Sequence, residues 1–210
     1  MAVYVVGITG ASGAPYARRL LQSLLDVGHQ VKLVVTESGE RVLAIELGLR
    51  LEGPLHERAE QWRSLLGRPS GDPALELFHL RDMAASISSG SFPTSGMVVI
   101  PCSMGTLARI AAGVSSTLVE RAADVTMKER RPLVLVPRES PLNEVHLENM
   151  LRLRRAGVDI LPAAPGFYHR PRTIDDLVDF VVARVLDRLG VESQLFQRWT
   201  GDVTEPVEER

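Results

Sequence analysis

The chain of 210 residues has a single cysteine, almost no net charge and no long apolar run. The lone cysteine, Cys102, excludes a disulfide within the chain and a cysteine-based metal cluster. A formal net charge of −2 argues against a nucleic-acid-binding surface. The apolar runs are too short to span a membrane, and the N-terminus lacks the basic flank of a signal peptide. We therefore expect a cytoplasmic protein that binds no nucleic acid, no membrane and no structural metal.

The sequence does contain an alternation of short apolar runs and amphipathic stretches of helical length. Hydrophobic residues make up 45% of the chain, enough for one large core. We predict strands at residues 3–8, 31–36, 97–101, 132–136 and 158–161. We predict helices at residues 14–27, 39–47, 103–112, 117–128, 141–156 and 173–189. This order indicates an α/β fold with a doubly wound parallel sheet, a flavodoxin/Rossmann-like three-layer sandwich.

A single domain is expected over residues 1–189, followed by a C-terminal extension over residues 190–210. We expect the extension to pack on a neighbouring subunit and then to become mobile, because its acidic end has no periodicity. Between residues 49 and 80 the pattern loosens, since glycines and prolines interrupt it. A helix at residues 55–66 is the one element predicted there.

Two strand-to-helix turns have the composition of anion-binding sites. Residues 9–14 read TGASGA, and the two glycines let the backbone approach a ligand while the next helix points its free N–H groups outward. Residues 101–106 read PCSMGT, in which Ser103 can cap a helix and Thr106 adds a hydroxyl one turn later. The first turn matches neither the dinucleotide fingerprint G-x-G-x-x-G nor a Walker loop. Taken alone it is equally compatible with a tight turn that holds no ligand, but two such turns favour an anion site.

A third strand end carries charge. The apolar run LVLV at residues 133–136 suits a strand covered on both faces, and Arg138 and Glu139 follow it closely. Ser140 can cap the next helix, and Pro141 suits its first turn. Both charged residues are therefore expected at the carboxyl edge of the sheet, where open α/β sheets bind their ligands.

Two further cations, Arg121 and Lys128, precede the same strand on a predicted helix. We expect them to gather with Arg138 and Glu139 around that strand. The alternative for Lys128 is that it begins a solvated, charged helix end, because it opens the run KERR.

Long segments spread over nearly the whole chain carry a family resemblance. They read GITGASGAPYARRLL, ISSGSF, VIPCSMGTL, ERAADVTMKERRPLVLVPRESP, HLENML and LPAAPGFYHRPRTIDDLVDFVVARVLD. In order and content, the chain resembles the UbiX family of flavin prenyltransferases. The resemblance implies non-covalent binding of FMN and transfer of a dimethylallyl group from dimethylallyl phosphate to reduced FMN. It further implies that the product, prenylated FMN, serves a UbiD-type decarboxylase, and that the protein is a homododecamer with active sites at subunit junctions.

The same resemblance implies roles for particular residues. FMN contacts fall on Gly10, Ala11, Ser12, Thr36, Ser103, Met104, Gly105, Thr106 and Arg138. Contacts to dimethylallyl phosphate fall on Gly90, Arg121, Lys128, Tyr168 and Arg184. Catalytic roles fall on Ser12, Glu46, Glu139 and Trp199, with Glu139 and Ser12 as a proton relay and no metal.

Each of these residues has an ordinary structural alternative. Arg184 lies on a predicted helix, where an exposed arginine is the usual case. Tyr168 suits an anchored loop aromatic, and Trp199 suits a packing contact between subunits. The loop around Gly90 is rich in hydroxyls and by itself favours a solvated loop.

Two other functions compete with prenyl transfer. The first is an FMN-dependent cysteine decarboxylase-like oxidative flavoprotein, whose Pro-x-Met-Asn signature is absent, since residues 137–143 read PRESPLN. The second is a non-catalytic FMN carrier subunit of a decarboxylase. The chain retains Lys128, Glu139, Tyr168 and Arg184, which speaks against a carrier, because a carrier needs no site for a second phosphate.

Overall fold

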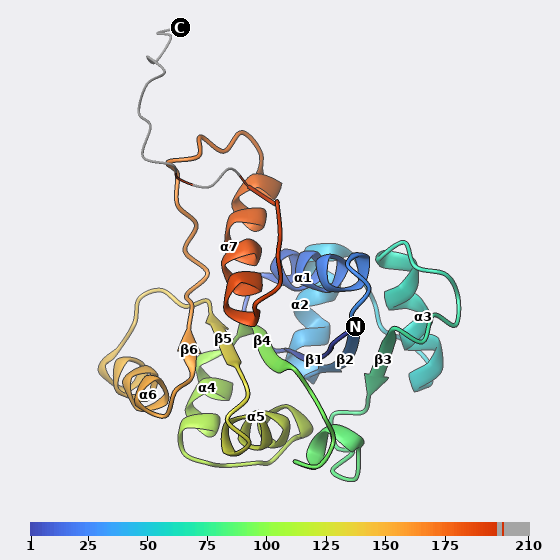
Figure 1. The fold of residues 1–210 in the computed structure, drawn as a ribbon, viewed down its shortest axis with the longest axis horizontal. Coiled ribbons are helices and arrows are strands. Elements are labelled where there is room, and N and C mark those ends of the chain that lie inside the picture. Colours follow the sequence, from blue (N-terminus) through green and yellow to red (C-terminus); the bar gives the residue numbers. More distant parts are fainter. Residues whose placement is uncertain (197–198, 200–210) are drawn as a thin grey trace, which may run out of the picture.

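The computed structural model describes residues 1–196 and 199 as one six-stranded parallel sheet with helices on both faces (Figure 1). The strands are β1 (Val3–Ile8), β2 (Gln30–Val35), β3 (Leu75–Phe78), β4 (Gly96–Cys102), β5 (Leu133–Pro137) and β6 (Asp159–Ile160). The helices are α1 (Ala14–Asp26), α2 (Glu37–Leu47), α3 (Leu55–Leu65), α4 (Met104–Ala111), α5 (Leu118–Lys128), α6 (Glu144–Arg155) and α7 (Ile174–Leu189), with a 3₁₀ turn, η1, at Ser86–Ser88. The predicted doubly wound α/β fold is confirmed.

The strand order is β3-β2-β1-β4-β5-β6, the order of Rossmann domains. From β1 the chain builds the sheet outward to β2 and β3, and then returns to add β4, β5 and β6 on the other side. The direction of winding therefore reverses between β1 and β4. Ligands of such sheets bind at this switch point, outside the carboxyl ends of the strands.

The apolar runs of the strands are unbroken because the sheet is covered on both faces. In β1, Tyr4, Val6 and Ile8 belong to a core packed against α1 and α7, whereas Val5 belongs to the core on the other face, with α4 and α5. Figure 1 shows these two helix layers on opposite sides of the sheet. Successive side chains of a strand point to opposite faces, so both sets must be apolar.

The structure departs from the sequence predictions at three elements. The short edge strand β3 was not predicted, because it has four residues and alternates buried with partly exposed side chains between interrupting prolines and glycines. Helix α2 begins at Glu37, two residues before the predicted start, with Thr36 as its N-cap.

Helix α6 begins at Glu144, so the predicted cap Ser140 and first-turn Pro141 are wrong. The side chain of Asn143 accepts a hydrogen bond from the backbone N–H of His146 at 2.9 Å. The ring nitrogen Nδ1 of His146 in turn accepts the N–H of Asn143 at 3.4 Å. This reciprocal capping box fixes the start of the helix three residues later than expected.

The described part of the C-terminal extension lies against its own chain. Val191 is buried in the core beside α7, and the ring of Phe196 lies 5.1 Å from that of Phe180. The expected packing of the extension on a neighbouring subunit stays a prediction, and its acidic end lies outside the described residues. Within the described residues, no helix combines the length and apolar character needed to cross a lipid bilayer.

Glu120 is a buried carboxylate that joins α4 to α5. It accepts hydrogen bonds from Arg109 at 2.6 Å, from the side chain of Ser116 at 2.9 Å and from both the backbone and the hydroxyl of Thr117. Burial alone would raise the pKa of Glu120, but the hydrogen bonds from Arg109, Thr117 and Ser116 outweigh it and lower the pKa below the ordinary value of 4.5.

A lowered folded-state pKa means that the ionised Glu120 stabilises the fold at neutral pH, and that this contribution is lost as the pH falls below about 4.5. Glu120→Gln should lower the unfolding free energy at pH 7 by about 1.5 to 3 kcal/mol, the range for a hydrogen bond to a charged group. It should also flatten the loss of stability between pH 5 and 3 in denaturant titrations. Glu148→Gln, at an exposed position on α6, is the control. Parallel pH profiles for the wild type and Glu120→Gln would contradict this role.

Candidate functional site

The buried hydroxyl of Thr9 ties together the turns that follow β1 and β4. Thr9 is 1% exposed. Its Oγ1 donates to the carbonyl of Pro101 at 2.8 Å and accepts the backbone N–H of Ser103 at 2.7 Å. The backbone N–H of Thr9 donates to the same Pro101 carbonyl at 3.2 Å. The two predicted anion-binding turns are therefore one structure, located at the switch point of the sheet.

The turn after β1 also packs tightly on the start of α2. A side chain at Gly10 would place its Cβ only 2.4 Å from the Cβ of Ser38, so this position has room for glycine alone. Thr36 donates its backbone N–H to the carbonyl of Ile8 at 2.9 Å, and its Oγ1 accepts the N–H of Gly39 at 3.0 Å. Because capping uses Oγ1 as an acceptor, the hydroxyl proton of Thr36 is left for a ligand.

Arg138 brings the turn after β5 to the same place. Its Nε donates to the carbonyl of Ser12 at 3.2 Å, and the side chain is exposed. The neighbouring Glu139 is also exposed, and its carboxylate accepts the backbone N–H of Ser140 at 3.1 Å. Among the described residues, no hydrogen bond joins Glu139 to Ser12, so the relay between them stays a prediction.

Helix α4 begins with donors that face the site. The side chain of Ser103 accepts the N–H of Thr106 at 3.3 Å, which confirms Ser103 as the N-cap. The N–H groups of Met104 and Gly105 have no acceptor within the described part of the chain. A Cβ added at Gly105 would meet only the guanidinium of Arg109, at 3.6 Å. The helix start is thus open, and its unpaired N–H groups suit a negatively charged ligand.

Helix α1 differs, because a carboxylate already occupies its N-terminus. Glu46 accepts the N–H of Gly13 at 3.0 Å and that of Ala14 at 2.8 Å. We expected these N–H groups to point outward unpaired, and this expectation is wrong. Glu46 binds where an anion would bind, since a carboxylate satisfies the same orphan donors and the same helix dipole.

Gly90, Lys128 and Arg121 form a second group elsewhere in the chain. A Cβ at Gly90 would lie 2.5 Å from Nζ of Lys128, which pairs with Glu129. Arg121 donates to the carbonyl of Ser88 at 3.1 Å and so holds the same loop. Gly90, Arg121 and Lys128 therefore lie close together, and their contacts with dimethylallyl phosphate stay a prediction.

The expected gathering of Lys128 with Arg138 is wrong within one chain. Lys128 ends α5 and precedes β5, at the amino edge of the sheet, whereas Arg138 directly follows β5 at the carboxyl edge. The five residues of β5 alone span about 16 Å.

Arg131 was missed by sequence reasoning, although it organises the Gly90 loop. It donates to the carbonyls of Gly90 at 2.7 Å and Phe92 at 2.8 Å. In the sequence it is one cation in the run KERR, and nothing in the run distinguishes it. The loop is therefore held at its backbone by two arginines and is not merely solvated.

Tyr168 and Trp199 lie together beside α7, and Arg184 is on α7 itself, four residues after Phe180. The ring centroid of Tyr168 lies 5.8 Å from that of Trp199 and 5.7 Å from that of Phe180. Phe180 and Arg184 line one cavity of about 460 Å³ between α7 and β6. Arg184 also forms an ion pair with Asp187 at 3.0 Å.

Cys102 is fully buried beside the turn that holds Ser103. Burial raises the pKa of its thiol to about 12. The thiolate, which is the nucleophilic form, is therefore strongly disfavoured at neutral pH. Cys102 is therefore a small core residue.

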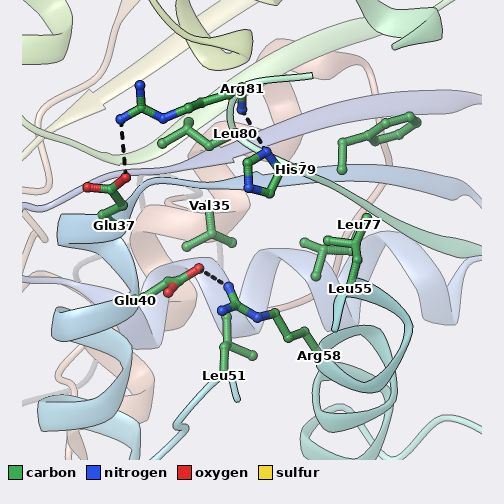
Figure 2. Close-up of a pocket in the computed structure, with 11 residues that line it drawn as sticks. Val35, Glu37, Glu40, Leu51, Leu55, Arg58, Leu77, His79, Leu80 and Arg81 are labelled. Atoms are coloured by element: carbon green, nitrogen blue, oxygen red, sulfur yellow. Dashed lines mark hydrogen bonds and ion pairs between the residues drawn. The ribbon is translucent and has the colours of Figure 1, made fainter. Parts of the chain in front are cut away.

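A separate hollow of about 210 Å³ lies at the carboxyl ends of β2 and β3, between α2 and α3. Figure 2 shows that its charged side chains are already paired, Glu37 with Arg81 at 3.5 Å and Glu40 with Arg58 at 2.7 Å. It therefore offers no unpaired charge for a phosphate. No group of three histidine, cysteine, aspartate or glutamate side chains among the described residues could hold a metal ion.

These features define an α/β protein whose switch point combines open N–H groups with Arg138, an arrangement that suits an anionic ligand. The family model described as Flavoprotein matches residues 2–186. The flavin prenyltransferase UbiX of Halalkalibacterium halodurans is 52% identical over 94% of this chain and 93% of its own length. The chain therefore belongs to the flavoprotein family and, within it, to the UbiX flavin prenyltransferases.

Two solved structures are similar to the chain over nearly its whole length. AnUbiX in complex with FMN and dimethylallyl pyrophosphate superimposes with a TM-score of 0.82 at 40% identity, over 95% of this chain and 98% of that one. A dodecameric FMN-dependent UbiX-like decarboxylase from Escherichia coli O157:H7 gives a TM-score of 0.81 at 46% identity, over 95% and 100%.

The Thr9 linkage predicts how the two turns respond to substitution. Thr9→Val keeps the side-chain shape but leaves the N–H of Ser103 without its acceptor, so we expect a loss of about 1 to 3 kcal/mol in unfolding free energy. Amide exchange at Ser103 should accelerate. Thr9→Ser should retain protection of this amide. Thr126→Val, which removes a buried hydroxyl from α5 that donates to Ala122 at 2.7 Å, should lower stability without affecting exchange at Ser103. Unchanged exchange in Thr9→Val would contradict the linkage.

Proposed function

We propose that the chain transfers the dimethylallyl group of dimethylallyl phosphate to reduced FMN, and that the prenylated FMN serves a UbiD-type decarboxylase. The observation that carries the proposal is the open start of α4, linked through Thr9 to the glycine turn, in a chain 52% identical to a flavin prenyltransferase. A cytoplasmic location is part of the same proposal.

The groups at the switch point fit FMN. The start of α4, at Ser103, Met104, Gly105 and Thr106, offers the N–H groups of Met104 and Gly105, which have no acceptor among the described residues, to phosphate or flavin oxygens. Arg138 adds a cation, and the hydroxyls of Ser12 and Thr36 add donors. The backbone of Gly10 and Ala11 contacts the flavin, and the packing of Gly10 against Ser38 leaves room there for glycine alone. FMN, when bound, supplies the reduced ring to which the dimethylallyl carbon is joined.

The prenyl donor requires residues from more than one copy of the chain. Gly90, Arg121 and Lys128 lie near the amino edge of the sheet or on the helix that leads to it, whereas the flavin groups lie at the carboxyl edge. A second copy must therefore bring Lys128 to the flavin. Exposed apolar side chains on α6, namely Val145, Leu147 and Leu151, supply a surface for such assembly. We propose a homododecamer, by analogy with the dodecameric protein of Escherichia coli O157:H7.

The reaction needs charge stabilisation and exclusion of water. The allylic carbon–oxygen bond breaks, and its electron pair leaves with the phosphate. Lys128, Arg184 and the hydroxyl of Tyr168 stabilise the departing phosphate. Trp199, beside Tyr168, presents a ring face to the cationic carbons. Glu139, aided by Ser12, removes the ring proton, and Glu46 holds the start of α1 close by.

The two rival functions have less support. An oxidative cysteine decarboxylase would carry a Pro-x-Met-Asn signature after β5, and this chain reads PRESPLN there. A carrier of FMN needs only the flavin site. This chain also has Arg184 in the lining of a cavity, and the paired rings of Tyr168 and Trp199.

To test the proposal, the protein is incubated anaerobically with reduced FMN and dimethylallyl phosphate. The mass of the extracted flavin is then measured by mass spectrometry. We expect a flavin heavier by one dimethylallyl group, and none without the donor. Unmodified FMN that nevertheless copurifies with the protein would favour a carrier. Oxidative loss of carbon dioxide from a C-terminal cysteine peptide would favour the decarboxylase.

Glu139→Gln separates proton transfer from binding. The amide has the shape of the carboxylate but no basicity, so FMN affinity should change little. Turnover should fall by roughly two to four orders of magnitude, the effect of losing a general base. The measurement pairs FMN titration with anaerobic single turnovers, and Glu148→Gln is the control. Normal turnover in Glu139→Gln would assign the base elsewhere.

Mixed oligomers test the sharing of sites. Ser103→Asp keeps a helix cap but sets a negative charge against the flavin, and Lys128→Ala removes the cation for the prenyl donor. Each variant alone should be inactive. Refolded or coexpressed mixtures should regain activity, because some junctions combine an intact flavin side with an intact Lys128. Verified mixed oligomers without any activity would show that each chain uses its own Lys128.

A further inference from the structure

A chain of hydrogen bonds leads from a buried carboxylate to the open start of α4. Arg109, on α4, donates from Nε to Glu120 at 2.6 Å and from Nη2 to Oγ1 of Thr106 at 3.1 Å. The same oxygen of Thr106 accepts the hydroxyl of Ser103 at 3.1 Å. Ser103 is the N-cap of α4, and its backbone N–H is held by Thr9. One guanidinium therefore connects α5 to the hydroxyls at the switch point.

The carboxylate end of this chain is fixed. Glu120 is 1% exposed, and one of its oxygens accepts the hydroxyl of Ser116 and both donors of Thr117. Its other oxygen accepts Nε of Arg109. Because the guanidinium is a rigid planar fork, a fixed Nε also fixes the direction of Nη2. The ion pair with Glu120 thus holds Arg109 with one N–H directed at Thr106.

The hydroxyl of Thr106 has its acceptor positions filled. A hydroxyl accepts two hydrogen bonds and donates one, and Oγ1 of Thr106 accepts from both Arg109 and Ser103. Its own proton has no acceptor within the part of the chain that the structure describes, although Thr106 is 2% exposed. A buried donor without an acceptor is costly, so this proton suits an acceptor atom of a ligand at the helix start.

The guanidinium makes Thr106 a stronger donor. A hydroxyl that accepts hydrogen bonds, one of them from a cation, is polarised and donates more strongly. The positive charge of Arg109 also lies behind the helix start, where the open N–H groups already favour an anion. Because the side chain of Arg109 is 43% exposed, water screens its direct field, and the contact through Thr106 carries the larger share.

We propose that Arg109, held by Glu120, is a positioning residue that directs the hydroxyl proton of Thr106 at the flavin and makes the site favour reduced over oxidised FMN. The inference rests on the proposed function, in which FMN lies against the start of α4. Reduction adds an electron pair to the flavin ring, and near neutral pH the reduced ring carries a negative charge that the oxidised ring lacks. A strengthened donor with a cation behind it therefore stabilises the reduced ring more.

The experiment is a double-mutant cycle between Arg109 and Thr106. Arg109→Met keeps the apolar stem and removes the guanidinium, Thr106→Val removes the hydroxyl, and the double variant removes both. Anaerobic titrations measure the affinity for reduced and for oxidised FMN, and the reduction potential of bound FMN is measured separately. The control is Thr126→Val, which removes a buried hydroxyl of α5 that donates to Ala122.

Arg109→Met should weaken binding of reduced FMN roughly three- to thirtyfold and that of oxidised FMN by about twofold, within the range for residues of one hydrogen-bond network. The potential of bound FMN should therefore fall. In the Thr106→Val background, loss of Arg109 should change either affinity by no more than about twofold.

Two further variants separate position from stability. Arg109→Lys keeps the charge but loses the fork, so its preference for reduced FMN should lie between those of the wild type and Arg109→Met. Thr126→Val should lower the unfolding midpoint and leave the ratio of the two affinities unchanged. If Arg109→Met fails to fold with Glu120 left unpaired, the same measurements are made on Arg109→Met combined with Glu120→Gln, with the same expected loss of preference.

Equal losses for the two states of FMN, or losses that add fully in the double variant, would overturn the inference and leave Arg109 as a brace between α4 and α5. Failure of the proposed function has a different signature. Wild-type protein would then bind FMN without transferring the dimethylallyl group, and the affinity ratios would still decide the inference. A wild type that binds neither state of FMN would overturn both.

Discussion

The hydroxyl of Thr9 is the contact on which the site depends. It is buried, and it accepts the N–H of Ser103 while donating to the carbonyl of Pro101. These bonds fix the start of α4 against the turn after β1, so that the open N–H groups and the glycine turn lie together at the switch point. Both turns follow central strands that are buried on both faces, and the rigidity of the sheet therefore sets their spacing.

The parallel direction of the strands keeps Arg138 and Lys128 of one chain apart. Parallel strands place Arg138 after β5 and Lys128 before it, at opposite edges of the sheet. In the proposed function, the residues assigned to the flavin and the Lys128 group therefore meet between two copies of the chain. The charged side chains of the hollow in Figure 2 already form ion pairs, whereas an anion site needs cations that the chain has not neutralised.

The sequence predicted the strands that are buried along their whole length. It did not predict the residues whose roles depend on particular tertiary contacts. Unbroken apolar runs identified β1, β4 and β5, because strands covered on both faces allow no polar alternation. The edge strand β3 was missed because four alternating residues leave too short a signal. Glu46 was assigned a role by resemblance, but its position at the start of α1 depends on how α2 packs, which no local pattern encodes. Arg131 and Thr9 were missed because their functions lie in contacts with distant backbone atoms.

In the proposed function, one chain binds the flavin at the Thr9-linked turns and a neighbouring chain completes the site. An experimental structure of the assembled protein with FMN and inorganic phosphate would show whether the site is shared in this way. We expect the flavin against the start of α4 and Arg138, with Lys128 of a second copy within hydrogen-bond distance of the phosphate. Flavin bound in the hollow between α2 and α3, or a phosphate held only by residues of the same chain, would contradict the claim.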